Sequence, residues 1–161
     1  MNVGFSTLIR AIVGFGIVSV AGSAYAADGI TIKDPWIRAA PPNATVMAGY
    51  LTIVNDMGTA VAIRSARSTD FAKVEVHETV MRDGRVHMQH RPELPIAAHS
   101  SVKLEPNGMH LMLVEPKRRL ALGASVAVVF TLADGKEVTF DMNVKNTSDE
   151  PAQHNSHHQQ Q

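Results

Sequence analysis

Apolar and polar residues alternate over short stretches that are separated by Asp, Asn and Gly, and no stretch shows a long helical period. Alternation with a period of two predicts strands that are buried on one face. The predicted strands are Thr45–Asn55, Ala60–Ala66, Ala72–Arg82, Arg85–Gln89, Val102–Leu104, His110–Val114, Ser125–Leu132 and Glu137–Val144. Many short strands with regular turns indicate an all-β fold, either a β-sandwich or a Greek-key barrel.

One turn fixes a strand register. Asp83-Gly84 lies between two predicted strands, and this dipeptide is a strong signal for a two-residue hairpin loop. With that loop His77 faces His90, and Thr79 faces Met88. Paired residues in a hairpin share one face of the sheet, so we expect His77 and Met88 to be diagonal neighbours.

The first 26 residues have the pattern of a secretory signal. Arg10 precedes the apolar run Ala11–Val20, and Ala24-Tyr25-Ala26 is a small-x-small cleavage site. The apolar run is shorter than the ~20 residues that a membrane-spanning helix needs, which disfavours a retained anchor. We therefore expect cleavage after Ala26, export to the periplasm and no membrane insertion of the mature chain.

The last segment, residues 147–161, is polar and rich in Gln, so we expect it to be disordered and the folded domain to span 27–146. It carries His154, His157 and His158, and short His-rich tracts bind metal. Ligation by imidazole alone suits Cu(II), so the tail is a candidate Cu(II) site. The alternative is a solvated tail without a metal role.

Composition excludes several functions. The chain has no Cys, which removes disulfides, thiolate metal sites and thiol nucleophiles. It has 15 Lys and Arg against 15 Asp and Glu, and this balance gives no basic surface for nucleic acid or anionic lipid.

Four residues stand out as metal ligands because they combine two imidazoles with two thioethers. They are His77, Met88, His110 and Met112, with the spacing H-x10-M-x21-H-x-M. Thioether sulfur is a soft, neutral ligand that selects Cu(I), and imidazole also suits copper. The set is a poor match for Zn²⁺, which favours thiolate, imidazole and carboxylate, and for Ca²⁺ or Mg²⁺, which favour oxygen.

These four residues match, position for position, the motif of the PCuAC family of periplasmic copper chaperones. The surrounding segments V-E-V-H-E-T and L-E-P-N-G-M-H-L-M-L are also similar, and the resemblance runs from about Trp36 to Val144. It implies a cupredoxin-like fold and a transient copper acceptor, such as the binuclear copper centre of cytochrome c oxidase. The family usually has Pro-Gly-Gly where this chain has Pro106-Asn107-Gly108. Asn tolerates left-handed backbone, so we expect the loop to be kept.

Other functions fit less well. A blue-copper electron carrier requires a Cys thiolate, which the chain lacks. A metallohydrolase needs a carboxylate base beside a Lewis-acidic ion. Glu75 and Glu78 flank His77, but the register places Glu78 on the opposite face, and thioether ligands do not help to activate water. We therefore expect a monomeric copper carrier that binds Cu(I) at an exposed site, rather than an enzyme. A copper buffer without a dedicated acceptor remains the alternative.

The remaining Met and His residues are not expected to bind copper at this site. His90 and Met81 share the predicted face with His77 but lie outside the motif. Met47 and Met142 lie in apolar strand patterns, which is typical of core residues.

Overall fold

The computed structural model describes residues 24–27 and 29–146, and all regular structure within them is β-strand. The strands are β1 (Ala24–Ala27), β2 (Ile30–Arg38), β3 (Val46–Asn55), β4 (Val61–Arg67), β5 (Phe71–Arg82), β6 (Arg85–His90), β7 (Leu94–Ile96), β8 (Ser100–Leu104), β9 (Met109–Pro116), β10 (Ser125–Leu132) and β11 (Glu137–Lys145). This described part of the chain contains no helix that could cross a membrane. The prediction of an all-β fold is confirmed.

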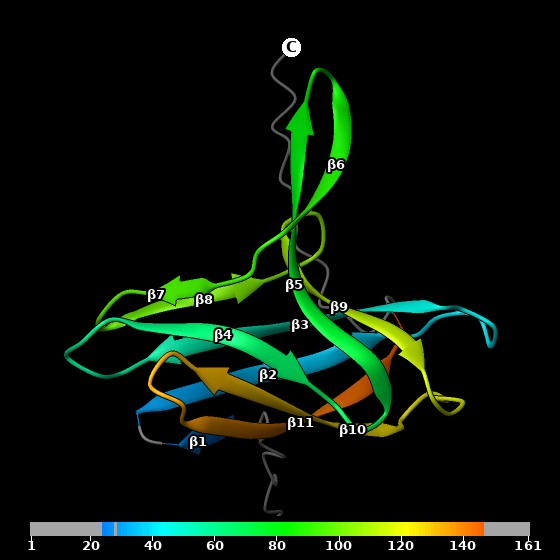
Figure 1. The fold of residues 1–161 in the computed structure, drawn as a ribbon. Coiled ribbons are helices and arrows are strands. Elements are labelled where there is room, and N and C mark those ends of the chain that lie inside the picture. The colour runs from blue at the N-terminus through cyan, green and yellow to red at the C-terminus, as the bar shows by residue number, and fades with distance from the viewer. Residues whose placement is uncertain (1–23, 28, 147–161) are drawn as a thin grey trace, which may run out of the picture.

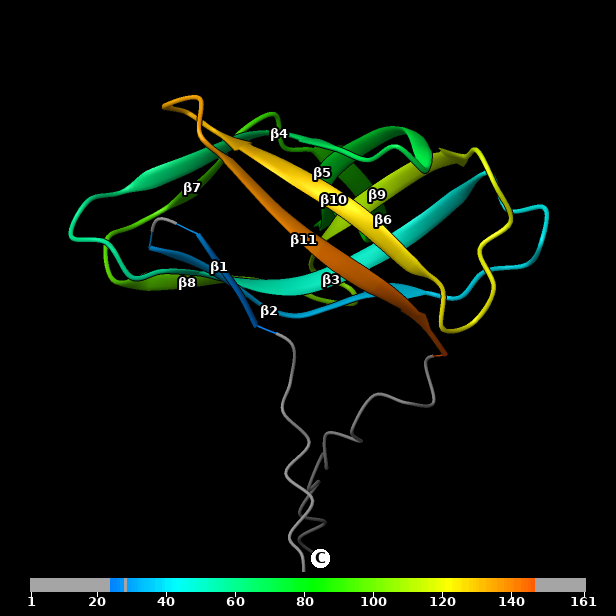
Figure 2. The ribbon, with the colours of Figure 1, turned by 90° about the horizontal axis from the view of Figure 1, so that it is seen from below.

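Seven strands close into a barrel (Figure 1). Their order is β2–β11–β10–β4–β5–β9–β3, and β3 pairs back with β2 to complete the ring. The β11–β2 pair is parallel, and the other pairs in the ring are antiparallel. Figure 2 shows β10 and β11 crossing the underside of the barrel, with β1 and β2 beside them. Closure leaves the main strands without free edges.

The barrel interior is filled by apolar side chains, which in the most regular strands come from every second residue. In β11 buried and exposed residues alternate without a break, and Phe140 packs against Phe130 with their ring centroids 4.8 Å apart. Met47 and Met142 are buried in this core, as expected. Strand β9 directs Leu111 and Leu113 into the core, where both are fully buried.

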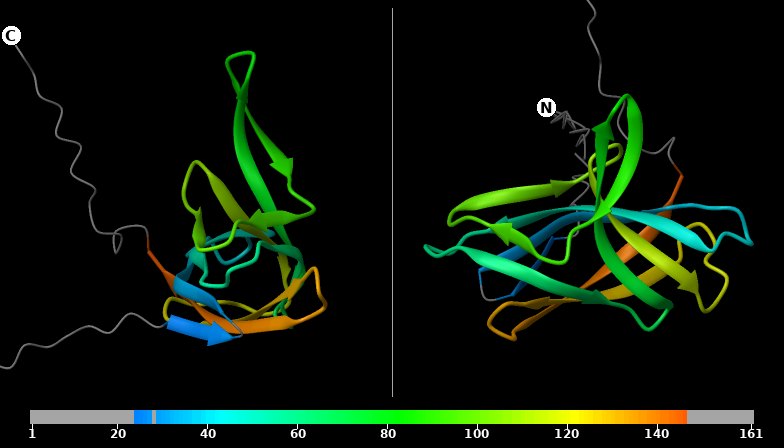
Figure 3. Two further views of the ribbon diagram at one scale, coloured as in Figure 1. Left: turned by 90° about the vertical axis from the view of Figure 1, so that its left-hand side faces the viewer. Right: turned by 45° about the horizontal axis from the view of Figure 1, so that its top comes forward.

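Strand β5 is longer than the barrel and continues beyond it. Its first half places Phe71, Val74 and Val76 in the core. Its second half pairs with β6 in a hairpin that stands clear of the barrel in both views of Figure 3. The turn residues Asp83 and Gly84 have φ values of 52° and 71°, as a type I′ turn requires.

The structure agrees with the predicted hairpin and loop and adds strands that were not predicted. The hairpin register is the predicted one, and Asn107 adopts the left-handed backbone that the loop needs, with φ of 65°. The alternation pattern did not predict β1, β2 or β7. The expected tail lies outside the described residues, as does the expected signal segment apart from β1, which overlaps the expected cleavage site.

Candidate metal centre

Three adjacent strands, β6, β5 and β9, carry the candidate site. His77 lies on the central strand and pairs with His90 on β6 and with His110 on β9. In the next rows Thr79 pairs with Met88, and Glu75 pairs with Met112. Paired residues on antiparallel strands point to the same side. All four motif residues therefore lie on one face of the three strands.

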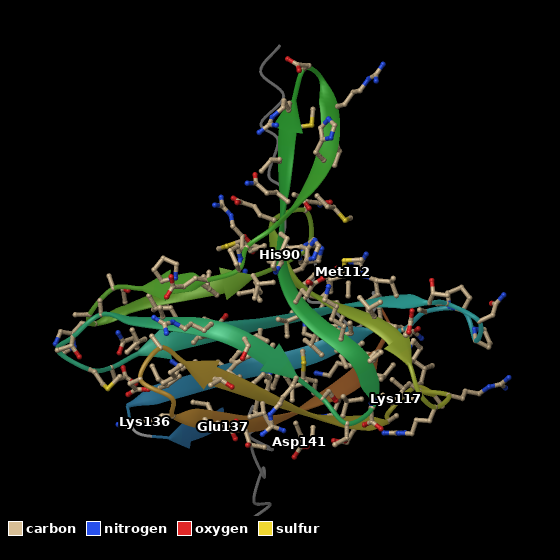
Figure 4. The ribbon with its side chains drawn as sticks, viewed as in Figure 1. His90, Met112, Lys117, Lys136, Glu137 and Asp141 are labelled. Atoms are coloured by element: carbon tan, nitrogen blue, oxygen red, sulfur yellow. The ribbon has the colours of Figure 1, made fainter. Side chains whose placement is uncertain are left out.

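The histidines form a row at the foot of the hairpin. The ring centroid of His77 is 6.2 Å from that of His110 and 5.4 Å from that of His90. Figure 4 shows His90 and Met112 at this place, where the hairpin leaves the barrel, whereas Asp141 lies on the far side. Because Leu111 and Leu113 point into the core, His110 and Met112 lie on the outer surface of β9.

The site is less exposed than expected. His110 is only 7% exposed and the His77 side chain 13%, whereas Met88 is 65% exposed. The loop before β9 folds against the foot of the hairpin, where the Gly108 carbonyl accepts a hydrogen bond from the Thr79 N–H at 3.2 Å. At this place the two imidazoles are largely covered, and the thioether of Met88 is in solvent.

Each of the two imidazoles is held by an acceptor that sets its tautomer. His110 Nδ1 lies 3.1 Å from the Gly108 carbonyl oxygen, so this nitrogen donates and Nε2 keeps the lone pair. His77 Nε2 lies 3.2 Å from a Glu75 carboxylate oxygen and donates to it in the same way. The other nitrogen of His77, Nδ1, is buried and has no hydrogen-bond partner among the described residues.

Glu75 is the charged group of the site. Its carboxylate contacts Lys73 Nζ at 2.7 Å, His77 Nε2 at 3.2 Å and His90 Nε2 at 3.7 Å. The hydrogen bond from Lys73 lowers the pKa of Glu75, partial burial opposes this, and the His77 contact lowers it further. The carboxylate is therefore ionised at neutral pH and can only accept hydrogen bonds.

This donor set suits a soft ion. Among residues 24–27 and 29–146, no group of three or more His, Cys, Asp or Glu side chains is placed to hold a metal. Met88 and Met112 lie on the same face and offer thioether sulfur as additional ligands. Two imidazole lone pairs and two thioethers form a neutral set that fits Cu(I).

The contact between Glu75 and His77 was not predicted from the sequence. The spacing of the two residues could have indicated this contact, because positions i and i+2 of a strand share a face. His90 was placed on the correct face, and its contact with Glu75 was not foreseen. The candidate tail ligands His154, His157 and His158 lie outside the described residues.

The family follows from a match over most of the domain. Residues 30–144 match the model of a family described as "Putative lipoprotein LpqE-like". The chain belongs to the LpqE-like family. A relative from Leifsonia xyli subsp. xyli, described as "Putative lipoprotein Lxx21020", is 31% identical over 123 residues, which cover 76% of this chain and 73% of the relative.

Solved structures share the fold of this LpqE-like chain. The copper-bound PCuAC domain from PmoF2 superposes with a TM-score of 0.66 at 24% identity, covering 77% of this chain and 98% of that domain. The Cu(I) form of DR1885 from Deinococcus radiodurans gives a TM-score of 0.58 at 23% identity, covering 80% and 83%. The barrel is therefore the cupredoxin-like fold of PCuAC domains, as predicted.

Proposed function

We propose that this protein is a periplasmic copper chaperone that binds one Cu(I) through His77, Met88, His110 and Met112. The observation that carries the proposal is the strand register, which brings these four side chains to one face although they come from two separate regions of the chain. The copper-bound PCuAC domains with the same fold support it.

The difference in exposure between the ligands suggests how copper would leave. Met88 is largely in solvent, whereas His77 and His110 are covered. An incoming thiolate or thioether of the acceptor would displace Met88 first, while the imidazoles still hold the ion. The four proposed ligands carry no charge themselves, so transfer of Cu(I) to an anionic thiolate ligand is electrostatically favourable.

The acceptor we propose is a copper-accepting periplasmic protein or an oxidase subunit, such as the one that holds the binuclear copper centre of cytochrome c oxidase. Docking would be transient and small, as is usual for such encounters. We propose that the protein acts as a monomer and has no enzymatic activity. The N-terminal signal pattern and the lipoprotein description of the family support export to the cell envelope.

A copper buffer is the second candidate, and the burial of His77 and His110 favours it, because covered ligands slow the release of the ion. The two functions differ in the route of release. If Cu(I) moves to an apo acceptor faster than it dissociates to a chelator, the protein is a chaperone. Equal rates would make it a buffer.

Anaerobic Cu(I) titration combined with X-ray absorption tests the site. We expect one Cu(I) per chain with both sulfur and nitrogen ligands. The double variant Met88→Ala, Met112→Ala should bind Cu(I) at least about tenfold more weakly, a loss of ~1.4 kcal/mol or more. Met81→Ala is the matched control, because Met81 lies on the same hairpin and is 70% exposed. Wild-type affinity in the double variant would exclude the assigned ligands.

A further inference from the structure

The buried Nδ1 atom of His77 needs an explanation. Buried polar atoms in folded proteins nearly always have a hydrogen-bond partner, and an unpaired one carries a desolvation cost. His77 Nδ1 is covered and unpaired, while Nε2 of the same ring is paired with Glu75. In His77, Nε2 is therefore held by Glu75 and Nδ1 has no partner. The side chain lies on the face that carries the other proposed copper ligands.

We propose that Glu75 is a positioning residue that locks His77 in its Nε2–H tautomer and so presents Nδ1 to copper. This inference rests on the proposed function and adds the ligating atom and the residue that selects it. By the same reasoning His110, whose Nδ1 donates to the Gly108 carbonyl, binds through Nε2. The two imidazoles therefore use different nitrogens.

Glu75 is well placed for this role because it is itself held. It lies two residues before His77 on β5, so the strand fixes the relative position of the two side chains. Its other carboxylate oxygen contacts Lys73 Nζ at 2.7 Å, and its side chain is only 18% exposed. A carboxylate behind a metal-binding imidazole orients the ring and raises the basicity of the nitrogen that binds the metal.

A rival arrangement uses the same residues. Copper could bind His77 through Nε2, in which case Glu75 would be displaced and Nδ1 would carry the proton. His90 Nε2, 3.7 Å from the same carboxylate, could then take over the contact with Glu75. The two arrangements differ in which nitrogen of His77 is protonated, so they can be separated directly.

Long-range ¹H–¹⁵N correlation spectra of the full chain, labelled with ¹⁵N-histidine, give the required measurement. They report the tautomer of each histidine, and Cu(I) is diamagnetic, so the loaded protein can be studied too. Near pH 8, where free histidine is neutral, we expect His77 to be protonated at Nε2 in the apo protein. On addition of Cu(I), the Nδ1 signal should shift while Nε2 stays protonated. Protonation at Nδ1 in either state would overturn the inference.

Three variants test the role of the carboxylate. Glu75→Ala should give a mixture of His77 tautomers and weaken Cu(I) binding about 10- to 100-fold, the usual effect of losing such a support. Glu75→Gln keeps one acceptor oxygen and should recover part of both properties. Glu78→Ala is the matched control, because Glu78 is also ion-paired on β5 but contacts Arg91 and lies on the other face.

The outcomes separate this inference from the proposed function. An unchanged His77 tautomer in a folded Glu75→Ala protein would refute the positioning role, whether or not copper binds. Binding of one Cu(I) through His77 Nε2 would refute the inference and leave the chaperone proposal standing. Absence of Cu(I) binding by the wild type would refute the proposed function, while the apo tautomers would still test the role of Glu75.

Discussion

Single side chains at the foot of the hairpin differ in how firmly they are held. His110 is fixed by the Gly108 carbonyl and His77 by Glu75, whereas Met88 has a largely exposed side chain. A thioether needs no proton transfer to bind or release copper, and a flexible one can be replaced quickly. We therefore expect the two covered imidazoles to keep Cu(I) bound, and the exposed thioether of Met88 to be the ligand that an acceptor replaces.

A second clear electrostatic contact, away from the site, leads to a prediction about stability. Arg118 donates to both Asp70 carboxylate oxygens, at 2.6 and 3.0 Å, and also to the Ser125 carbonyl. The hydrogen bond from Arg118 lowers the pKa of Asp70. Because the pKa of Asp70 is lower in the folded than in the unfolded protein, the contact stabilises the fold at pH values above the unfolded-state pKa of Asp70. This stabilisation is lost as the pH falls through the folded-state pKa.

We therefore expect Asp70→Asn to lower the free energy of unfolding at pH 7, and its deficit relative to the wild type to shrink between about pH 5 and pH 2. Denaturant unfolding followed by circular dichroism at several pH values measures this. Asp141→Asn, on an exposed position of β11, is the control. A deficit that stays constant down to the lowest pH would mean that Asp70 stabilises the fold in some other way.

At the scale of strands, the bounds of a strand were predicted best where regular alternation ends at a clear turn. β10 has the predicted bounds, because its alternation is regular and Ala133 to Lys136 form a turn. β2 was missed because its pairing with β3 shifts register between Lys33 and Trp36, next to Asp34 with φ of 50°. Such an irregularity breaks the period-two pattern. β7 has three residues and contains Pro95, which is typical of an edge strand.

The site could be predicted only in part for a similar reason. The relation of His77 to Met88 follows from the local Asp83-Gly84 turn, so a register could be drawn. The pairing of His77 with His110 joins strands that are distant in sequence, and no local pattern specifies it. The burial of both rings follows from that pairing, which explains why an exposed site was expected.

The register also predicts at which other position of the hairpin a methionine should still bind Cu(I). Thr79 pairs with Met88 and shares its face, whereas the neighbouring Val80 points the other way. In a Met88→Ala background, Thr79→Met should recover much of the Cu(I) affinity and Val80→Met should not. Competition with a chromophoric Cu(I) chelator gives both affinities. Equal recovery by the two variants would show that the face of the hairpin does not matter.

At the scale of the whole molecule, the barrel is closed without β1. The ring of seven strands is completed by the β2–β3 and β11–β2 pairs, and β1 only adds to β2. Cleavage after Ala26 would remove three of the four residues of β1, Ala24–Ala26. The mature domain should therefore remain folded.

We expect protein exported from a native-like host to begin at Ala27, and a chain starting there to unfold within a few degrees of one starting at Ala24. N-terminal sequencing and thermal unfolding measure the two properties. Retention of Met1 in the exported protein would contradict the first expectation. A large loss of thermal stability would show that β1 belongs to the folded core.

Variants of the C-terminal segment, residues 147–161, test whether the chain binds copper in two oxidation states. His154, His157 and His158 are close in sequence and offer imidazole nitrogen alone, which suits Cu(II), whereas the barrel site offers thioethers, which suit Cu(I). Deleting residues 147–161 should remove one equivalent of Cu(II) and leave the Cu(I) stoichiometry unchanged. Replacing the three histidines by Ala in the full-length chain should have the same effect, which separates the ligands from the length of the tail. Equal Cu(II) uptake by all three proteins would leave the tail without a role in metal binding.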